Sequence, residues 1–216
     1  MSTVAVIDYG MGNLRSVCKA IEHVSPKARV QLTSDPAVIR RADRVVFPGQ
    51  GAIGGCMAAL EHGDLRESLL EAMKTKPFLG ICLGLQALYD FSEEGGGTPC
   101  LSLLAGSVKR FPAEKMTDKT TGLPLKVPHM GWNQVHQRKP HPLWHDIAQD
   151  SRFYFVHSYY AESAQSGDVT GSTDYGLRFT SAAARANIFA VQFHPEKSQQ
   201  AGLTLLENFV AWDGTA

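Results

Sequence analysis

The stretch Lys76-Pro-Phe-Leu-Gly-Ile-Cys-Leu-Gly-Leu-Gln-Ala-Leu-Tyr89 decides how this chain folds. It begins with an apolar run at 78–81 that has the length of a buried strand. It ends with Leu85, Leu88 and Tyr89 at the i, i+3, i+4 spacing of a helix. The stretch therefore predicts a strand that turns directly into a helix.

The middle of this stretch, Gly80-Ile-Cys82-Leu-Gly84, has the spacing of a nucleophile elbow, with cysteine where serine is more usual. The two glycines leave room for the strained turn, where neighbouring Cβ atoms would collide. The turn is expected to push the Cys82 sulfur into the open and to aim the helix N-terminus at it, which favours the thiolate. The backbone amide of Leu83 would then stabilise an oxyanion. The alternative is that Cys82 is a small buried hydrophobe.

The composition is that of an ordinary globular domain. The chain has 216 residues, 44% of them hydrophobic, which suits one α/β domain with a full core. The 21 basic and 21 acidic residues cancel, so nothing argues for nucleic acid or a membrane surface as a partner. No apolar run approaches the ~18 residues of a membrane span. The first residues, 1–8, are typical of a first strand rather than of a signal peptide.

The cysteines and histidines do not predict a metal site. The four cysteines show no C-x-x-C pairing, so neither zinc nor a disulfide framework is expected, and a reducing cytoplasm fits best. His141 and His145 have i, i+4 spacing, but Pro142 argues against a helical metal site.

The apolar runs alternate with helical stripes, which is the pattern of an α/β fold. Buried strands are expected at 4–8, 28–32, 44–47, 78–81 and 188–193. The later part of the chain is weaker and richer in β signals: strands are expected at 108–111 and 153–159, and an exposed excursion at 112–126. We therefore expect an open, mostly parallel sheet flanked by helices, with some additional antiparallel strands.

The loop after the strand at 44–47 contains Gly49-Gln50-Gly51-Ala-Ile-Gly54, a G-x-G-x-x-G sequence. A dinucleotide site also needs an acidic residue at the end of the next strand, and this chain has Cys82 there instead. Because this loop and the elbow would end neighbouring strands, we expect its backbone amides to form an oxyanion hole.

A base and its orienting partner are expected at His194-Pro195-Glu196, after the last apolar strand. Proline keeps His194 out of the helical region, and residues two apart in an extended segment face the same way. The carboxylate of Glu196 would bond one ring nitrogen and leave the other for Cys82. His157, in the aromatic run, is expected to be a satisfied core histidine instead. The three groups predict acyl transfer at a carboxamide carbon.

These motifs resemble those of the class I, triad-type glutamine amidotransferases. More narrowly, four strings resemble the glutaminase subunits of imidazole glycerol phosphate synthase: Asp8–Ser16, Pro48–Ala52, Val127–Asn133 and His194–Ser198. The resemblance covers the chain almost end to end and implies a single, flavodoxin-like amidotransferase domain over residues 1–216. It implies that glutamine is hydrolysed through a cysteinyl thioester, without cofactor or metal. Ammonia would pass through a channel to a cyclase subunit with a (β/α)₈ barrel, in a cytoplasmic heterodimer. The cyclase would make imidazole glycerol phosphate and aminoimidazole carboxamide ribotide in histidine biosynthesis.

The resemblance also implies the roles of single residues. Cys82, His194 and Glu196 would be the catalytic triad. The other implied positions are Gly49, Gln50, Gly51 and Leu83 at the oxyanion hole, Gln86 on the α-amino or carboxylate group of the substrate, and Asn13, Trp132 and Lys197 at the cyclase interface. The chain departs from the family where Gln50 replaces a frequent apolar residue and Ile53 a frequent aromatic one.

Three other functions remain open from the sequence. The chain could be another glutaminase subunit, such as that of pyridoxal phosphate or anthranilate synthesis, but the string at 8–16 argues against this. A dinucleotide-binding protein would use the glycines at 49–54. A non-catalytic regulatory module would carry the elbow as a vestige.

Overall fold

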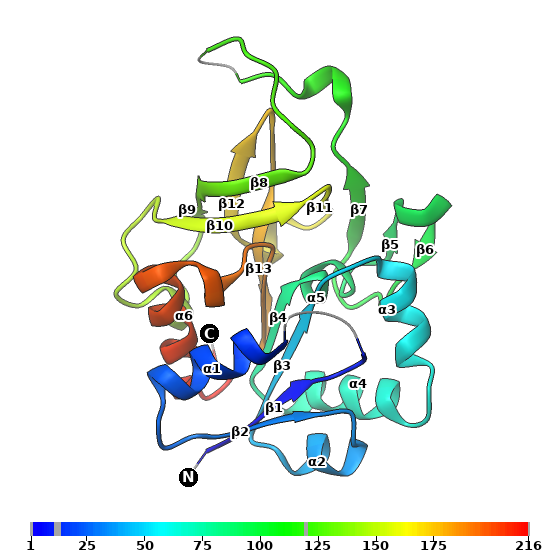
Figure 1. The fold of residues 1–216 in the computed structure, drawn as a ribbon, viewed down its shortest axis with the longest axis vertical. Coiled ribbons are helices and arrows are strands. Elements are labelled where there is room, and N and C mark those ends of the chain that lie inside the picture. The colour runs from blue at the N-terminus through cyan, green and yellow to red at the C-terminus, as the bar shows by residue number, and fades with distance from the viewer. Residues whose placement is uncertain (1, 11–13, 119–120, 216) are drawn as a thin grey trace.

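Five parallel strands form the part of the sheet on which the rest of the chain is built (Figure 1). The computed structural model describes residues 2–10, 14–118 and 121–215. The parallel strands lie in the order β2 (Arg29–Thr33), β1 (Thr3–Ile7), β3 (Arg44–Gly49), β4 (Phe78–Cys82) and β14 (Ile188–Val191). The five predicted runs are therefore confirmed, with shifts of one or two residues at their ends.

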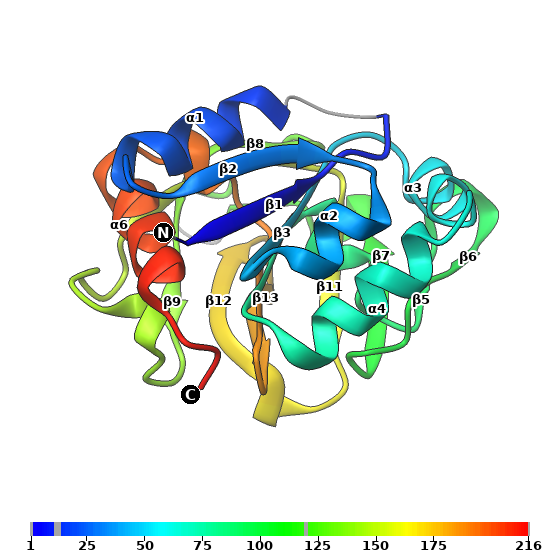
Figure 2. The same ribbon diagram turned by 90° about the horizontal axis from the view of Figure 1, so that it is seen from below.

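These strands are apolar on both sides because helices cover both faces of the sheet (Figure 2). On one face α1 (Leu14–Val24) packs beside α6 (Gln199–Ala211), and on the other α2 (Pro36–Arg41) packs beside α4 (Leu65–Thr75), near α3 (Ile53–Leu60). Successive strand residues enter different cores, since side chains alternate across a strand. Val6 lies in the core under α1 and α6, and Ile7 in the core under α2 and α4. Full burial of one such side chain stabilises the fold by about 1.5–3 kcal/mol.

An antiparallel extension continues the sheet beyond β14. Its strands are β13 (Leu177–Arg185), β11 (Tyr159–Ser163), β7 (Gly106–Arg110), β5 (Phe91–Ser92) and β6 (Thr98–Pro99), with β12 (Val169–Tyr175) and β9 (His136–Gln137) joined through β13. Only β5–β7 is a parallel pair in this part. The hairpin of β12 and β13 is not among the predicted strands, although Gly176, with φ +69°, makes its turn and β-branched residues precede it. The predicted α/β class with added antiparallel strands is confirmed.

A separate antiparallel pair, β8 (His129–Gln134) and β10 (Arg152–His157), crosses the upper part of the molecule in Figure 1. The single strand expected at 153–159 is therefore wrong. β10 ends at His157, and Tyr159 begins β11 in the other sheet. Between them, the Ser158 carbonyl accepts the amide proton of Phe111. Tertiary pairing, rather than local pattern, breaks the aromatic run at this residue.

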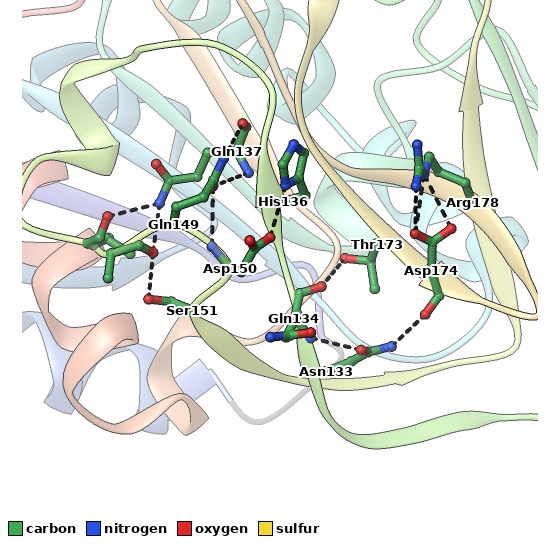
Figure 3. A network of polar contacts seen from close by, with 12 residues as sticks. Asn133, Gln134, His136, Gln137, Gln149, Asp150, Ser151, Thr173, Asp174 and Arg178 are labelled. Atoms are coloured by element: carbon green, nitrogen blue, oxygen red, sulfur yellow. Dashed lines mark hydrogen bonds and ion pairs between the residues drawn. The ribbon is translucent and has the colours of Figure 1, made fainter. Parts of the chain in front are cut away.

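Polar side chains fasten β8 to β12 (Figure 3). The Asn133 amide donates to the carbonyl of Asp174 at 3.0 Å, and the Thr173 hydroxyl donates to the carbonyl of Gln134 at 2.9 Å. Beside them, His136 contacts Asp150 at 3.0 Å. The position of β8 is thus set by side chains as well as by its ladder with β10.

The remaining elements are short: α5 (Leu83–Gln86), η1 (Glu94–Gly96), η2 (Ala113–Lys115), η3 (Pro142–Trp144), η4 (Ser166–Asp168) and η5 (Pro195–Lys197). The excursion at 112–126 is not wholly exposed, because Met116 is buried in the core with Phe111. None of the helices in the described ranges has the length and apolarity needed to span a bilayer.

Candidate active site

Cys82 lies where β4 turns directly into α5, and its backbone is strained, with φ 54° and ψ −102°. The flanking glycines are required by space. A Cβ on Gly84 would lie 1.9 Å from the carbonyl oxygen of Phe47, and one on Gly80 would lie 3.0 Å from Ala190 and from the Gly84 carbonyl. The predicted elbow geometry is confirmed.

The helix after the elbow is shorter than expected, since α5 ends at Gln86 and does not continue to Tyr89. The carbonyls of Ala87, Leu88 and Tyr89 accept amide protons from residues 101–104 at 2.8–3.0 Å. These three carbonyls therefore accept from the loop at 101–104, where a longer helix would have had them accept from its own next turn. The sulfur also differs from expectation: Cys82 is only 7% exposed and faces a cavity rather than open solvent.

His194 and Glu196 are joined by a hydrogen bond of 2.9 Å between Nδ1 and Oε1, and each side chain is 2% exposed. The expected extended segment is wrong beyond His194, because Pro195 opens the 3₁₀ turn η5. Ser198 closes this turn by donating its hydroxyl to the His194 carbonyl at 2.6 Å. The turn still brings the two side chains together, as predicted.

The charge of His194 is set by its neighbours. Burial alone would lower the pKa of this ring, but the nearby Cys82 sulfur and the Glu196 carboxylate outweigh it and raise the pKa to about 10. The Nε2 atom of His194 is buried and has no hydrogen-bond partner within the described residues. The ring is thus suited to hold a proton on Nε2 beside the sulfur.

The glycine loop ends β3 next to the elbow. Gly49 is the register partner of Cys82, which confirms that the two loops end neighbouring strands. A Cβ on Gly49 would lie 2.1 Å from the Tyr9 hydroxyl and 2.7 Å from the Leu83 Cβ, so the loop backbone is pressed against the elbow. Gly51 has φ +100°. As the first residue of α5, Leu83 has no intrahelical acceptor for its amide proton.

A cavity of ≈ 430 Å³ opens over the sulfur, a size that fits a small molecule. Of the predicted residues, those that line it are Gln50, Gly51, Cys82, Leu83, Gln86, His194 and Lys197. Gly49 and Glu196 lie behind this wall and line a smaller space. The Gln86 amide nitrogen donates to the Tyr159 carbonyl and to Gln192 Oε1, both at 3.0 Å. Because both of its protons are engaged, Gln86 offers a ligand only the acceptor Oε1, which suits an ammonium group rather than a carboxylate.

Several residues of the site are not among the predictions, and three of them are Glu94, Gln192 and Tyr159. Glu94 lines the cavity and accepts the amide proton of Ile53 at 2.8 Å. Gln192 is fully buried, and its amide nitrogen lies 3.6 Å from the Cys82 sulfur. Tyr159 lines the cavity. A polar residue inside the apolar run 188–193 was a usable signal for Gln192, but nothing in the sequence singles out the other two.

The predicted interface residues are only partly together. Trp132, 41% exposed, lies edge-on to the Tyr154 ring at 6.2 Å, and Lys197 Nζ lies 6.0 Å from the same ring. Trp132 lines a neighbouring cavity rather than the one over Cys82. Asn13, the third predicted residue, lies outside the described residues.

Two further buried histidines, His141 and His157, form hydrogen bonds within the protein. His141 accepts the amide proton of Leu143, and His157 is satisfied and buried, as expected from the sequence. No group of three or more His, Cys, Asp or Glu side chains in the described part of the chain is arranged to hold a metal ion.

Comparison with known proteins gives one family. The model of the family "Glutamine amidotransferase class-I" matches residues 5–212. The "Imidazole glycerol phosphate synthase subunit HisH" of Aromatoleum aromaticum is 62% identical over 98% of this chain and 99% of its own length. The protein of the same name from Nitrosospira multiformis is 59% identical over the same shares.

Solved structures show the same fold at low identity. A putative GMP synthase protein from Thermoplasma acidophilum has a TM-score of 0.69 at 18% identity, covering 98% of this chain and 93% of its own. The glutaminase domain of Trypanosoma brucei CTPS with bound acivicin has a TM-score of 0.65 at 16% identity, covering 99% and 95%. The family match over nearly the whole chain, together with relatives well above half identical, shows that this chain belongs to the class I glutamine amidotransferases.

Proposed function

We propose that this chain is the glutaminase subunit of an imidazole glycerol phosphate synthase. It hydrolyses glutamine and passes ammonia to a cyclase subunit with a (β/α)₈ barrel, which makes imidazole glycerol phosphate and aminoimidazole carboxamide ribotide in histidine biosynthesis. The observation that carries this proposal is the meeting of the strained Cys82, the buried His194–Glu196 pair and the glycine loop around one cavity. The relatives' names supply the synthase to which this chemistry would belong.

The proposed reaction has two steps. Cys82 is the nucleophile in the first and water in the second, and His194 transfers a proton in both. The Cys82 thiolate attacks the carboxamide carbon, and the amides of Leu83 and of the loop at 49–51 stabilise the oxyanion. His194 then gives its Nε2 proton to the leaving nitrogen, so that ammonia departs and a thioester remains. Water then loses a proton to Nε2 of His194 and attacks the thioester, so that the Cys82 thiolate leaves and glutamate is released. Glu196 holds the ring in place, and Gln86 Oε1 accepts from the substrate ammonium.

A docked partner follows from the fate of ammonia. In water at neutral pH, ammonia is protonated to ammonium, which is not a nucleophile. A glutaminase therefore needs an acceptor enzyme that covers the exit, and we assign Asn13, Trp132 and Lys197 to this interface. We further propose that residues 1–216 act as one amidotransferase domain in the cytoplasm, since both cores lie on one sheet and the cysteines at 18, 56, 82 and 100 are unpaired thiols.

The test is the release of glutamate from glutamine, with and without the cyclase and its nucleotide ligand. We expect weak release by the chain alone and strong stimulation in the complex. Cys82→Ala should abolish release, whereas Cys18→Ser, which changes a partly exposed thiol on α1, should not. Equal rates with and without the cyclase would contradict the proposed partnership, and an active Cys82→Ala protein would contradict the chemistry.

A further inference from the structure

Two buried histidines form a shared wall between the catalytic cavity and a second cavity. The second cavity, ≈ 600 Å³, lies beside β8 and is lined by His129, while His157 lines the cavity over Cys82. The two residues are opposite each other in the β8–β10 ladder, and His129 Nδ1 lies 2.9 Å from His157 Nε2. They are 3% and 6% exposed. The reaction proposed above uses neither ring.

The protons on this pair follow from its two ends. His157 Nδ1 lies 2.7 Å from the carbonyl oxygen of Tyr159, which can only accept, so Nδ1 carries the proton. His157 Nε2 therefore accepts from His129 Nδ1, and His129 Nε2 accepts from the Asn133 amide at 3.3 Å. The Asn133 amide is oriented independently by its bond to the carbonyl of Asp174, drawn in Figure 3. Both ends impose the same direction on the chain of hydrogen bonds.

Both rings are neutral at pH 7. Burial lowers the pKa of His129 to about 4, and burial together with the neighbouring His129 lowers the pKa of His157 to about 3. A second proton on either ring would place its N–H group opposite another donor, the His129 Nδ1–H or the Asn133 amide, and would break that hydrogen bond. The pair is therefore a fixed hydrogen-bonded unit and not a proton carrier.

The same chain continues to the nucleophile. The Tyr159 carbonyl also accepts from Gln86, whose second amide proton goes to Gln192 Oε1. The amide nitrogen of Gln192 in turn donates to the Cys82 sulfur at 3.6 Å. Hydrogen bonds thus run without a break from Asn133 on β8 to the Cys82 sulfur at the end of β4.

We propose that His129 and His157 are positioning residues for the glutaminase reaction and that Gln192 is a catalytic residue at its nucleophile. The histidine pair fixes the Tyr159 carbonyl and, through it, the orientation of the Gln86 amide that meets the substrate. Gln192 fixes the sulfur and donates to its negative form. The inference rests on the function proposed above, and it adds two histidines that act through Gln86 and a glutamine that contacts the sulfur itself.

Two changes test this series of hydrogen bonds, and a third change serves as a matched control. Gln192→Met removes the donor at the sulfur at similar size. The double change His129→Phe/His157→Phe removes the pair without orphaning either ring nitrogen, and phenyl rings suit the surrounding aromatic cluster of Phe111, Phe155 and Phe179. His141→Phe removes a third buried histidine, 8% exposed, which packs on Phe189 and Trp212 outside the chain of hydrogen bonds.

The readouts are kcat and KM for glutamine in the complex with the cyclase, the melting temperature, and the rate at which iodoacetamide alkylates Cys82 at pH 7, followed by mass spectrometry. We expect Gln192→Met to lower kcat about tenfold and to slow alkylation several-fold, and to raise KM less than the double change does, because Gln86 keeps its bond to the Tyr159 carbonyl. The double change should raise KM about tenfold with a smaller effect on kcat. His141→Phe should leave kcat, KM and alkylation within about threefold of the wild-type protein.

Folded variants that keep wild-type kcat, KM and alkylation rate would overturn the inference. Should the double variant not fold, Gln192→Met and Gln192→Glu decide alone. Gln192→Glu keeps an acceptor for Gln86 but sets an oxygen against the sulfur, so it should slow alkylation at least as much as Gln192→Met. Alkylation needs neither glutamine nor the cyclase, so it still tests the hydrogen bond from Gln192 to Cys82 if the wild-type protein releases no glutamate.

Discussion

Oε1 of Glu196 lies 2.9 Å from Nδ1 of His194, and both side chains are almost wholly buried. The bond leaves Nε2 as the ring nitrogen available to Cys82. An ion pair in such surroundings is costly to break from one side, because the remaining charge has no water to stabilise it. The carboxylate therefore acts on the nucleophile through the ring.

Glu196→Gln should lower kcat for glutamate release about 10²-fold at pH 7, since the neutral amide no longer helps to raise the pKa of His194. The measurement is steady-state release by the complex with the cyclase. Glu162→Gln, which changes an exposed carboxylate paired with Lys109, is the control and should keep wild-type rates. An unchanged kcat in Glu196→Gln would remove Glu196 from the triad.

The buried neutral histidines predict how stability depends on pH. The folded-state pKa values of His129, His141 and His157, about 4, 4 and 3, lie below the unfolded value of 6.5. The unfolded chain therefore binds more protons between these values, and stability falls as the pH drops from 6.5 towards 4. Each histidine adds up to about 1.4 kcal/mol per pH unit to this slope. Urea unfolding between pH 4 and 7 should show a shallower slope for His129→Phe/His157→Phe; an identical slope would argue against neutral burial.

Gly84→Ala should destabilise the protein by about 3 kcal/mol or more, because the added Cβ would lie 1.9 Å from the Phe47 carbonyl oxygen, a backbone atom that cannot move aside. The matched control is Gly54→Ala in α3, where the nearest atom outside the helix is Thr98 Oγ1 at 3.8 Å. It should stabilise the helix by about 0.5–1 kcal/mol. Thermal unfolding distinguishes the two, and equal effects would contradict the close packing of the elbow.

Two arginines on β13 allow a comparison of an ion pair whose carboxylate is buried with one whose carboxylate is exposed. Arg185 contacts the buried Asp168 at 2.6 Å and the Leu103 carbonyl at 2.6 Å, which fixes the loop that caps the elbow helix. Arg178 contacts Asp174 at 2.8 Å, but both side chains are exposed. Arg185→Met should cost about 2 kcal/mol of unfolding free energy and Arg178→Met no more than about 0.5. Equal losses in urea unfolding would show that the partners' burial does not matter here.

The features that depend on near neighbours could be predicted from the amino-acid sequence. Two glycines around Cys82 specify the elbow, apolar runs specify the buried parallel strands, and Pro195 between His194 and Glu196 keeps the pair close whether the backbone is extended or in a 3₁₀ turn. Each of these results from sterics or side-chain period within a few residues.

The contacts that complete the site could not be predicted in this way, because they depend on how the whole chain folds. The length of α5 depends on a loop further along the chain, because the amides of residues 101–104 donate to the carbonyls of residues 87–89, just after the helix. Gln192 meets Gln86 across 106 positions, and His129 meets His157 across 28. No local pattern encodes such pairs, because they arise where strand order and register bring distant segments together. The partners at the two ends of the histidine pair, the Tyr159 carbonyl and the Asn133 amide, then fix which nitrogen of each ring carries the proton.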